Sequence, residues 1–400
     1  MTRTGNARLR WAGSLTAVTT VAALSALSPT AQAAPEGVVL GAGGPGTVSG
    51  SYIVTLKGGT KAPSALGRSI AEKYGAKISQ TYGTALNGYA VRVDERQARR
   101  LAADSHVASV VQDTRVTLDR YQKNPPSWGL DRIDQPNQPL DHGYTWPEPA
   151  GAGVTVYVID TGIRISHKDF GGRAGYGWDF VDNDRTASDA NGHGTHVAGT
   201  AVGTRYGVAK RAKVVAVRVL DAKGAGTTAQ VIAGIDWVTR HARKPAVANL
   251  SLGGYASTQL DAAVRNSIAS GVSYTVAAGN EGLPAGLYSP ARVPQAITVG
   301  AGDRKDTRAV FSNWGSGLDL FAPGVAITSD SSASDTATAT LSGTSMAAPH
   351  AAGAAALYLA KHPKATPAQV SRALVQQAVR GRVKNAGTGS PDRLLHVANP

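Results

Sequence analysis

Two regions with different hydrophobic rhythms follow the first 50 residues of the chain. Alternating apolar positions and helical spacings in the first region predict elements at 51–56, 64–74, 76–82, 88–93, 94–103 and 107–112. Their order, strand–helix–strand–strand–helix–strand, is that of a small ferredoxin-like α+β unit. A unit of this size ahead of a larger domain is often a prosegment, and we expect residues 51–120 to be one.

The second region alternates buried strands with amphipathic helices. Nearly continuous runs of apolar, β-branched residues predict strands at 154–159, 214–219, 246–250, 273–277 and 296–299. Helical spacing predicts helices at 194–202, 227–241, 258–269 and 366–378. This alternation predicts a doubly wound α/β domain over residues 121–400, with a mostly parallel sheet covered on both faces. Ligands bind such sheets beyond the carboxyl ends of the strands.

One further helix is apolar on every side. From Met346 to Lys361 nearly every side chain is small or apolar, which is typical of a helix surrounded by other elements. Pro349 fits a helix only in the first turn, where backbone N–H groups lack an intrahelical partner, so we expect the helix to begin near Ser345. A hydroxyl there lies beside free N–H groups and the positive end of the helix dipole, where developing negative charge is stabilised. The alternative is that Ser345 only caps the helix.

The first 50 residues are typical of an export leader followed by a linker. Arginines precede an apolar run from Trp11 to Leu27, and an A-x-A cleavage site ends at Ala33. We therefore expect residues 1–33 to be a signal peptide and the protein to be secreted. A membrane anchor is the alternative, but serines and threonines interrupt the run, and it is short for a span. The Gly-, Ala- and Pro-rich stretch 34–50 is expected to be a linker.

Composition narrows the classes of function. The formal net charge is +14, but residues 1–120 hold 14 Lys and Arg against 7 Asp and Glu, and residues 121–400 hold 27 against 20. Because the excess is divided equally and no dense basic run occurs, we expect no nucleic-acid partner. The chain has no cysteine, which excludes disulfides and thiolate metal sites.

Three polar residues besides Ser345 stand out by their surroundings. Asp160 and Asn280 each follow a predicted strand, and His193 lies between glycines in NGHGTHVAGT. Each has a structural alternative: a carboxylate that caps a turn, an Asx-turn, and a structural histidine. His193 and His196 form another alternative as a zinc pair, but their spacing is not H-E-x-x-H and no glutamate lies nearby to act as a base.

The motifs around these residues resemble those of subtilisin-like serine proteases, specifically the proteinase K branch with its aqualysin-type secreted enzymes. The matching strings are YVIDTGI, NGHGTHVAGT, YGVAK, VAVRVLD, VANLSLGG, AAGN, YSPARV, FSNWG, DLFAPG and GTSMAAPH. Residues 51–113 also resemble the inhibitory prosegment of this family. The order Asp, His, Ser along the chain is that of subtilisin.

The resemblance implies a role for each of the four residues. Ser345 would be the nucleophile, His193 its general base, and Asp160 the residue that orients the imidazole. The side-chain amide of Asn280 and the backbone N–H of Ser345 would form the oxyanion hole. The resemblance also implies protein or peptide substrates, a monomer without a membrane anchor, and a propeptide that serves as intramolecular chaperone and inhibitor.

The resemblance also assigns substrate-binding segments. The residues that match the walls of the family's primary specificity pocket are Ser251, Leu252, Gly253, Ala277, Ala278 and Gly279. The edge segment that pairs with the substrate backbone matches Gly224, Ala225 and Gly226. Because the walls are small or apolar and none is acidic, we expect cleavage after aromatic or large aliphatic residues, with otherwise broad specificity.

Structural, non-catalytic Ca²⁺ is implied at three places rich in oxygen ligands. The first is Asp319 with the backbone carbonyls of Pro294 and Ala296, the second is Asp131, Asp134, Gln135 and Asp141, and the third is Asp179 with Asp184. The alternative is that all of these are ordinary surface carboxylates.

The chain departs from close relatives in its lack of cysteine. Relatives usually carry cysteines at the positions of Ala190, Ala222, Gly286 and Gly317. Each native disulfide is typically worth about 2–5 kcal/mol. We therefore expect calcium and packing to offset that loss.

Two other functions compete with a protease. A lipase or esterase of the α/β-hydrolase type needs G-x-S-x-G and another order of catalytic residues, and the sequence around Ser345 has neither. A catalytically inactive binding protein with a protease fold is disfavoured because all four positions hold the required residue types. For an active protease, the mature N-terminus of relatives indicates self-cleavage near Arg120/Tyr121.

Overall fold

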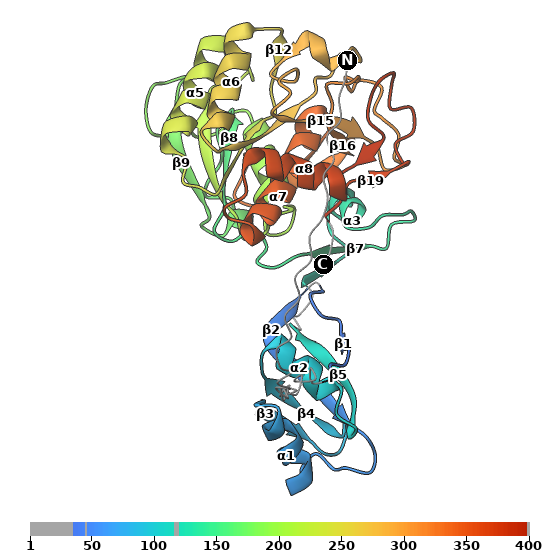
Figure 1. Ribbon diagram of the computed structural model, residues 1–400. Coiled ribbons are helices and arrows are strands. Elements are labelled where there is room, and N and C mark those ends of the chain that lie inside the picture. The colour runs from blue at the N-terminus through green and yellow to red at the C-terminus, as the bar shows by residue number, and fades with distance from the viewer. Residues whose placement is uncertain (1–34, 45, 116–119, 398–400) are drawn as a thin grey trace, which may run out of the picture. The chain divides into compact units, whose positions relative to one another are not determined.

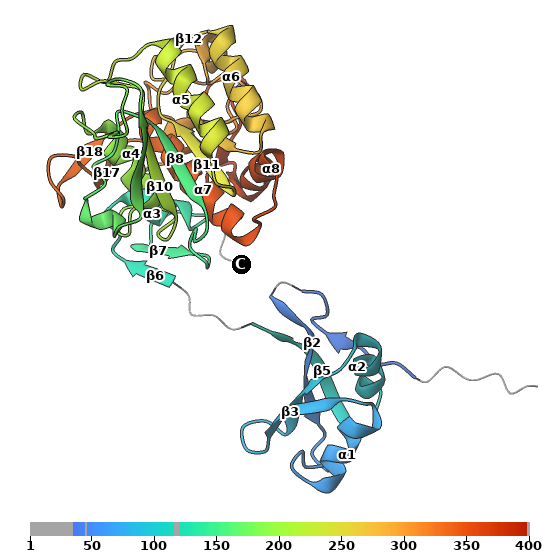
Figure 2. The same ribbon diagram turned by 90° about the vertical axis from the view of Figure 1, so that its left-hand side faces the viewer.

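The computed structural model describes residues 35–44, 46–115 and 120–397, which divide into two compact units (Figures 1 and 2). The described residues up to 115 belong to the first unit, and those from 120 belong to the second. The expected signal peptide, residues 1–33, lies outside the described residues. Within the described ranges, no helix combines the length and the apolar character needed to span a membrane.

The first unit is a five-stranded sheet with two helices. The strand order is β1-β5-β2-β4-β3, and only β1 and β5 pair in parallel. The bounds are β1 Val39–Leu40, β2 Thr47–Leu56, α1 Ala65–Lys73, β3 Lys77–Tyr82, β4 Gly88–Arg92, α2 Glu95–Ala102 and β5 Val107–Thr114. The side chains of Ser64 and Asp94 accept backbone N–H groups at the starts of α1 and α2, as these residue types do at helix N-termini. The predicted ferredoxin-like order is confirmed.

The prediction of a linker at 34–50 is wrong in part. Val39–Leu40 forms the edge strand β1, and β2 already begins at Thr47. Val39 is 5% exposed and packs into the hydrophobic core of this unit. Burial of this apolar side chain therefore outweighs the Gly-rich composition around it.

The second unit is built on a nine-stranded sheet. Its order is β19-β20-β16-β15-β13-β11-β8-β10-β9, and only β19 and β20 pair in antiparallel. Its strands are β8 Thr155–Asp160, β9 Ala174–Asp179, β10 Lys213–Arg218, β11 Ala246–Leu250, β13 Ser273–Ala277, β15 Ile297–Gly302, β16 Leu320–Pro323, β19 Val379–Arg380 and β20 Arg393–Leu394. Two-stranded ribbons add β6 Arg120–Lys123 with β7 Gly143–Trp146, β12 Gly254–Tyr255 with β14 Tyr288–Ser289, and β17 Ile327–Asp330 with β18 Thr338–Leu341.

Helices cover both faces of this sheet (Figure 1). They are α3 Trp128–Ile133, α4 His193–Val202, α5 Thr228–His241, α6 Thr258–Ala269, α7 Thr344–Lys361 and α8 Pro367–Gln377, with 3₁₀ turns at Lys168–Phe170 and Ala285–Leu287. Val156 of β8 packs in the cluster that contains α4 and α7, whereas the adjacent Tyr157 packs with α5 and α6. Alternate residues of the central strand thus face opposite layers. The predicted doubly wound α/β fold is confirmed.

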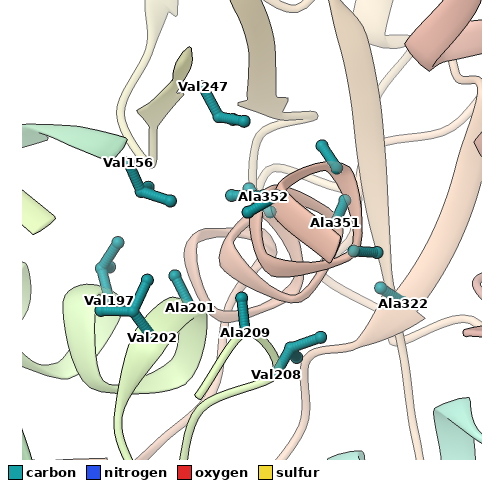
Figure 3. Close-up of a cluster of buried hydrophobic side chains, with 14 of the residues drawn as sticks. Val156, Val197, Ala201, Val202, Val208, Ala209, Val247, Ala322, Ala351 and Ala352 are labelled. Carbon is teal, nitrogen blue, oxygen red and sulfur yellow. The ribbon is translucent and has the colours of Figure 1, made fainter. Parts of the chain in front are cut away.

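Helix α7 runs through the middle of one hydrophobic layer (Figure 3). Ala351 and Ala352 of this helix lie among valines and alanines from the surrounding elements. A Cβ on Gly353 would lie 2.5 Å from the Val208 Cβ and 2.8 Å from the Ala201 carbonyl oxygen, closer than real atoms approach. The small side chains of α7 therefore allow its close packing against α4.

The prediction that Pro349 lies in the first turn of this helix is wrong. Because α7 begins at Thr344, Pro349 lies in the second turn, where it removes one intrahelical N–H donor. The carbonyl that loses this donor belongs to Ser345, and it accepts a hydrogen bond from the Ser251 hydroxyl at 2.8 Å. A side chain from a neighbouring segment thus satisfies the helix where its own ladder is broken.

Candidate active site

Asp160 and His193 form a hydrogen-bonded pair at the carboxyl edge of the sheet. Asp160, the last residue of β8, is fully buried, and His193 is the first residue of α4. His193 Nδ1 donates to Asp160 Oδ1 over 2.7 Å, and the same oxygen accepts the Thr161 N–H at 2.7 Å. Burial opposes a charge on the imidazole, but the nearby Asp160 carboxylate outweighs it, so the pKa of His193 is raised above its ordinary value.

A loop carboxylate that the sequence analysis missed holds this pair in place. Asp189 accepts the N–H groups of Gly192 and Thr195, each at 2.8 Å. It also accepts the hydroxyl of Thr161, the residue after Asp160, at 2.8 Å. Asp189 thus ties the start of α4 to the end of β8. The only signal for it in the sequence is an aspartate just before a glycine-bounded helix start.

His196 has a structural role and does not form a metal site with His193. Its Nε2 donates to the Ile327 carbonyl at 3.0 Å, and its side chain is fully buried. Burial lowers the pKa of His196 to about 4, so the ring is neutral at ordinary pH. In the described part of the chain, no three His, Asp, Glu or Cys side chains converge as metal ligands. The zinc alternative therefore has no support.

Ser345 lies in the first turn of α7, as the sequence predicts. Its hydroxyl donates to the Ser251 carbonyl at 3.0 Å, so in this structure it is bound to a wall of the cleft and not to His193. Catalytic hydrogen bonds are often absent or long in proteins without substrate and form only in the complex. The position of Ser345 is therefore compatible with a nucleophile.

Two N–H donors border one space beside Ser345. The N–H and hydroxyl of Thr344 both donate to Asn280 Oδ1, at 2.8 and 2.9 Å, and so fix the orientation of the Asn280 amide. A Cβ built on Gly343 would lie 3.6 Å from the Ser345 nitrogen and 3.7 Å from Asn280 Nδ2. Both nitrogens thus border the same volume, which the absence of a side chain at Gly343 leaves open. Such a pair of donors is suited to binding an oxyanion.

A cavity of about 120 Å³ opens beside Ser345. Its lining includes five of the predicted wall residues, Leu252, Gly253, Ala277, Ala278 and Gly279. Ser251, the remaining predicted wall residue, lines an adjoining cleft of about 780 Å³. That cleft is also lined by His193 and by the predicted edge residues Gly224, Ala225 and Gly226. Leu252 and Gly253 line both spaces, so the cavity and the cleft are adjacent.

The pocket is also lined by one acidic residue, Glu281, which lies outside the predicted wall segments. The carboxylate of Glu281 lies at the pocket, and its Oε2 accepts a hydrogen bond from Asn313 Nδ2 at 2.9 Å. Asn313 is fully buried, so this bond orients an otherwise exposed carboxylate. The sequence analysis missed Glu281 because it follows the matched segment and nothing in its pattern shows where its side chain turns.

The surroundings of Asp319 fit a cation. Asp319 and Pro294 line a common cavity of about 540 Å³, and Ala296 directly precedes β15. One oxygen of Asp319 accepts the Thr298 N–H at 2.8 Å. Burial raises the pKa of Asp319 to about 6, which means that its negative charge is poorly solvated. The guanidinium of Arg393 lies nearby and partly offsets this effect, and a calcium ion would add further positive charge.

The second predicted calcium site has unpaired, buried carboxylate oxygens, although its three aspartates do not converge as a ready-made set of metal ligands in the described part of the chain. Asp131 Oδ1 and Asp134 Oδ1 are buried and have no hydrogen-bond partner among the described residues. Burial and the neighbouring carboxylate of Asp141 raise the pKa of Asp131, and burial raises that of Asp134 to about 7. Gln135 Oε1 accepts the Asp141 N–H at 3.0 Å and so supports the loop. Unpaired carboxylate oxygens in a like-charged cluster favour a bound cation.

The structure does not support the third predicted calcium site. One oxygen of Asp179 pairs with the Arg218 guanidinium at 2.6 Å, and the other accepts the Val181 N–H at 2.7 Å. Asp184 uses its side chain to accept the Thr186 N–H at 2.6 Å. Arg218 therefore supplies the positive charge that the sequence analysis assigned to a metal ion.

The arrangement of these groups suits acyl transfer to a serine. Such chemistry needs a hydroxyl, an imidazole held by a carboxylate, and donors for an oxyanion. On a parallel α/β sheet, with the order Asp, His, Ser along the chain, these groups define a serine proteinase of the subtilisin type.

Comparison with known proteins agrees with this class. A family model described as the subtilase family matches residues 151–395, and one described as peptidase inhibitor I9 matches residues 51–119. The chain belongs to the subtilase family. It is therefore a serine proteinase, a hydrolase, and it carries an inhibitor-type propeptide.

Individual relatives cover most of the chain. An extracellular serine proteinase of Thermus sp. (strain Rt41A) is 49% identical over 94% of this chain and 96% of its own length. The alkaline serine exoprotease A of Vibrio alginolyticus is 47% identical over 81% of this chain and 61% of its own. The crystal structure of a cold adapted subtilisin-like serine proteinase has 53% identity and a TM-score of 0.67, covering 68% of this chain and 98% of that one.

Proposed function

We propose that the chain is a secreted endopeptidase that cleaves peptide bonds through a covalent acyl-enzyme, with Asp160, His193 and Ser345 as its catalytic triad. The observation that carries this proposal is the 2.7 Å hydrogen bond between His193 Nδ1 and the buried carboxylate of Asp160. A histidine held in this way at the edge of a cleft is poised to act as a general base. The leader-like residues 1–33 and the extracellular relative support secretion.

The reaction begins when the Ser345 hydroxyl exchanges the Ser251 carbonyl for Nε2 of His193. Ser345 Oγ attacks the substrate carbonyl carbon, and its proton passes to His193. The carbonyl oxygen becomes an oxyanion that the Asn280 amide and the Ser345 N–H stabilise. His193 then protonates the leaving amine, the C–N bond breaks, and the acyl group stays on Ser345. A water molecule deprotonated by His193 releases the acid product and restores the serine.

Asp160 acts through the imidazole. Its Oδ1 accepts the proton on His193 Nδ1 and so keeps Nε2 free to receive a proton from Ser345. When His193 becomes an imidazolium, the buried carboxylate stabilises that positive charge. Asp160 is therefore expected to raise the rate without itself changing protonation.

Aromatic or large aliphatic residues are the preferred side chains before the cut. The pocket beside Ser345 is lined mostly by small or apolar residues, and one buried apolar group discriminates by about 1–3 kcal/mol. Glu281 moderates this preference because it offers a counter-charge to a Lys or Arg that reaches the pocket. The edge at 224–226 pairs with backbone rather than side chains, which favours broad specificity.

Residues 51–120 act as a propeptide that assists folding, blocks the cleft and is removed by the enzyme itself. The cut expected near Arg120/Tyr121 falls in β6, whose residues pair with β7. A peptide bond inside a paired strand does not fit an extended substrate cleft. Either β6 separates from β7 before the cut, or the cut lies upstream, where Leu118 is an apolar residue of the preferred kind.

Calcium serves the stability of a monomeric enzyme at two of the three predicted sites. The proposed ligands are Asp319 with the carbonyls of Pro294 and Ala296 at one site, and Asp131, Asp134, Gln135 and Asp141 at the other. At both sites, Ca²⁺ would neutralise carboxylates that burial makes difficult to ionise. It takes no part in the chemistry at the serine.

One assay separates this function from its rivals. The purified protein is incubated with a casein-like protein, with and without a serine-directed inhibitor. A serine endopeptidase hydrolyses the protein, and the inhibitor abolishes hydrolysis. An esterase would cleave an ester but leave casein intact, and an inactive binding protein would cleave neither.

A further inference from the structure

Three exposed apolar side chains, Tyr255, Leu283 and Leu287, lie on segments next to the cleft and are together called the ridge. The exposed fractions of these residues are 86%, 45% and 54%. Single exposed apolar residues are common on soluble proteins and need no explanation. Three of them on adjoining segments beside a substrate cleft make this part of the surface a candidate for binding.

Tyr255 is held on a rigid support. It belongs to β12, which pairs in antiparallel with β14, and its ring stacks on that of Tyr288 with the centroids 5.9 Å apart. The next residue, Ala256, donates its N–H to the Leu287 carbonyl at 3.1 Å and so brings Leu287 beside Tyr255. A side chain already fixed in place loses little conformational freedom when it binds a partner.

Both backbone hydrogen-bonding groups of Leu283 have partners. Its N–H donates to the buried side chain of Asn313 at 2.9 Å, and its carbonyl accepts the Trp314 N–H at 3.1 Å. A short 3₁₀ turn, Ala285–Leu287, then leads the chain to β14. The whole ridge therefore presents apolar side chains on ordered backbone.

The ridge adjoins the spaces that a substrate occupies. Tyr255 lines the cleft of about 780 Å³, and Tyr288, on which it stacks, lines the pocket beside Ser345. Leu283 and Leu287 lie outside both linings. The ridge thus extends the protein surface near the cleft beyond the residues closest to the scissile bond.

We propose that this ridge is a second substrate-binding surface, which holds apolar and aromatic side chains of an unfolded polypeptide while another part of the same polypeptide occupies the cleft. The inference rests on the peptidase function proposed above and deepens it. The occupant is an unfolded chain, because a folded protein buries most of its large apolar side chains, whereas an unfolded one exposes them in numbers and can reach both surfaces. Apolar contacts of this kind add affinity without reading sequence.

The test compares two substrates and two pairs of variants. The substrates are a reduced, carboxymethylated protein and a dipeptide amide that is too short to extend from the cleft to the ridge. The disruptive variants are Tyr255→Ser and the double variant Leu283→Ser/Leu287→Ser, and the matched controls Tyr255→Phe and Leu287→Met keep the apolar area. We expect both disruptive variants to raise KM for the unfolded protein about five- to tenfold with kcat unchanged. The double variant should leave the dipeptide kinetics unchanged, and the controls should stay within about twofold of the parent.

Several results would overturn the proposal. An unchanged KM for the unfolded protein, or equal losses on both substrates with the double variant, would show that the ridge does not bind substrate. A change in oligomeric state by light scattering, or a change only in the rate of propeptide release, would assign the ridge to a second copy or to the propeptide. A parent that hydrolyses neither substrate would overturn the proposed function together with the inference that rests on it.

Discussion

Reciprocal hydrogen bonds join Ser345 to the wall of the cleft. Because Pro349 has no N–H, the Ser345 carbonyl accepts the Ser251 hydroxyl, while the Ser251 carbonyl accepts the Ser345 hydroxyl. Asn249 Nδ2 donates to the Ser251 hydroxyl oxygen at 2.8 Å and so orients it. The backbone of Ser345 is thus anchored independently of its side chain. The hydroxyl can therefore change partner during catalysis without moving the helix.

The pH dependence of activity follows from His193. As a general base, His193 must be neutral, so kcat/KM falls as the pH drops through its pKa and reaches a plateau above it. Because Asp160 raises the pKa of His193 above 6.5, we expect half-maximal kcat/KM at a pH above about 6.5. Asp160→Asn should lower this midpoint and reduce kcat by about 10⁴, the loss known for the same change in a trypsin-type triad. The measurement is a pH profile with a peptide amide.

The control for this pH profile is a variant that removes a carboxylate far from the active-site histidine in the sequence. Asp236→Asn removes an exposed carboxylate from α5 and should leave the midpoint where it is. An unchanged midpoint in Asp160→Asn would mean that another group governs the pH profile.

The specificity of the pocket depends on Glu281. For the parent, kcat/KM after Phe, Tyr or Leu should exceed that after Arg or Lys by at least about tenfold, as apolar burial predicts. Glu281→Gln should widen the ratio by a further three- to fivefold or so, because the counter-charge for a basic side chain is lost but is weakened by solvent. Matched Phe and Arg peptide amides give both ratios. Equal rates on the two peptides would contradict the apolar pocket, and an unchanged ratio in Glu281→Gln would remove its assigned role.

The residues whose side chains carry chemistry were easier to predict than those that position them. Asp160, His193 and Ser345 lie in motifs with a definite place at a strand end or a helix start. Asp189 can hold the start of α4 only because its loop folds back onto that helix. Glu281 lines the pocket only because a hydrogen bond from Asn313 orients its carboxylate. No periodicity in the sequence records such long-range contacts.

Among the elements, strands buried on both faces were predicted almost to the residue. β11 and β13 coincide with their predicted ranges, because a continuous β-branched run has one stable solution in a covered sheet. β9 and β16 were not predicted. β9 is an edge strand interrupted by glycines, and β16 is four residues long and ends in Pro323, so pairing with the neighbouring strands decides their conformation.

Two pairs of segments adjoin at the positions where the family resemblance leads us to expect cysteines, and one of these pairs is joined by a hydrogen bond. Asn191 Nδ2, next to Ala190, donates to the Ala222 carbonyl at 3.0 Å and connects the loop before α4 with the loop after β10. A Cβ on Gly317 would lie 3.8 Å from the Gly286 nitrogen, so those two segments also adjoin. One hydrogen bond contributes about 1 kcal/mol, less than a disulfide.

Calcium is expected to stabilise the loops that carry its ligands and so to raise the melting temperature of the enzyme. Exhaustive chelation should lower the melting temperature of the mature enzyme by about 5–10 °C. A ligand present at 100 times its Kd stabilises the native state by about 2.7 kcal/mol. Each kcal/mol changes the melting temperature of a domain of this size by about 2–4 °C. Asp319→Asn should remove part of the dependence on calcium, whereas the exposed control Asp236→Asn should preserve it. An unchanged melting temperature after chelation would identify these groups as ordinary carboxylates.

For the whole molecule, the central question is how the two units are separated. If the enzyme cuts itself, removal of the propeptide requires Ser345, and loss of the nucleophile in subtilisin reduces kcat by about 10⁶. Ser345→Ala should therefore accumulate as an uncut precursor, while the parent matures. Intact mass of both proteins, made in a host without other proteases, gives the result and locates the cut. Release of the propeptide from Ser345→Ala at the parental rate would mean that another enzyme makes the cut.

The proposed catalysis depends above all on the activation of Ser345 by Asp160 and His193. The most direct measurement is mass spectrometry of the mature parent after treatment with a fluorophosphonate, followed by peptide mapping. The account predicts one adduct per chain, located on Ser345, and a strongly slowed reaction in mature His193→Ala, obtained by supplying active parent to remove its propeptide. An adduct on a different residue, or a parental labelling rate in His193→Ala, would contradict it.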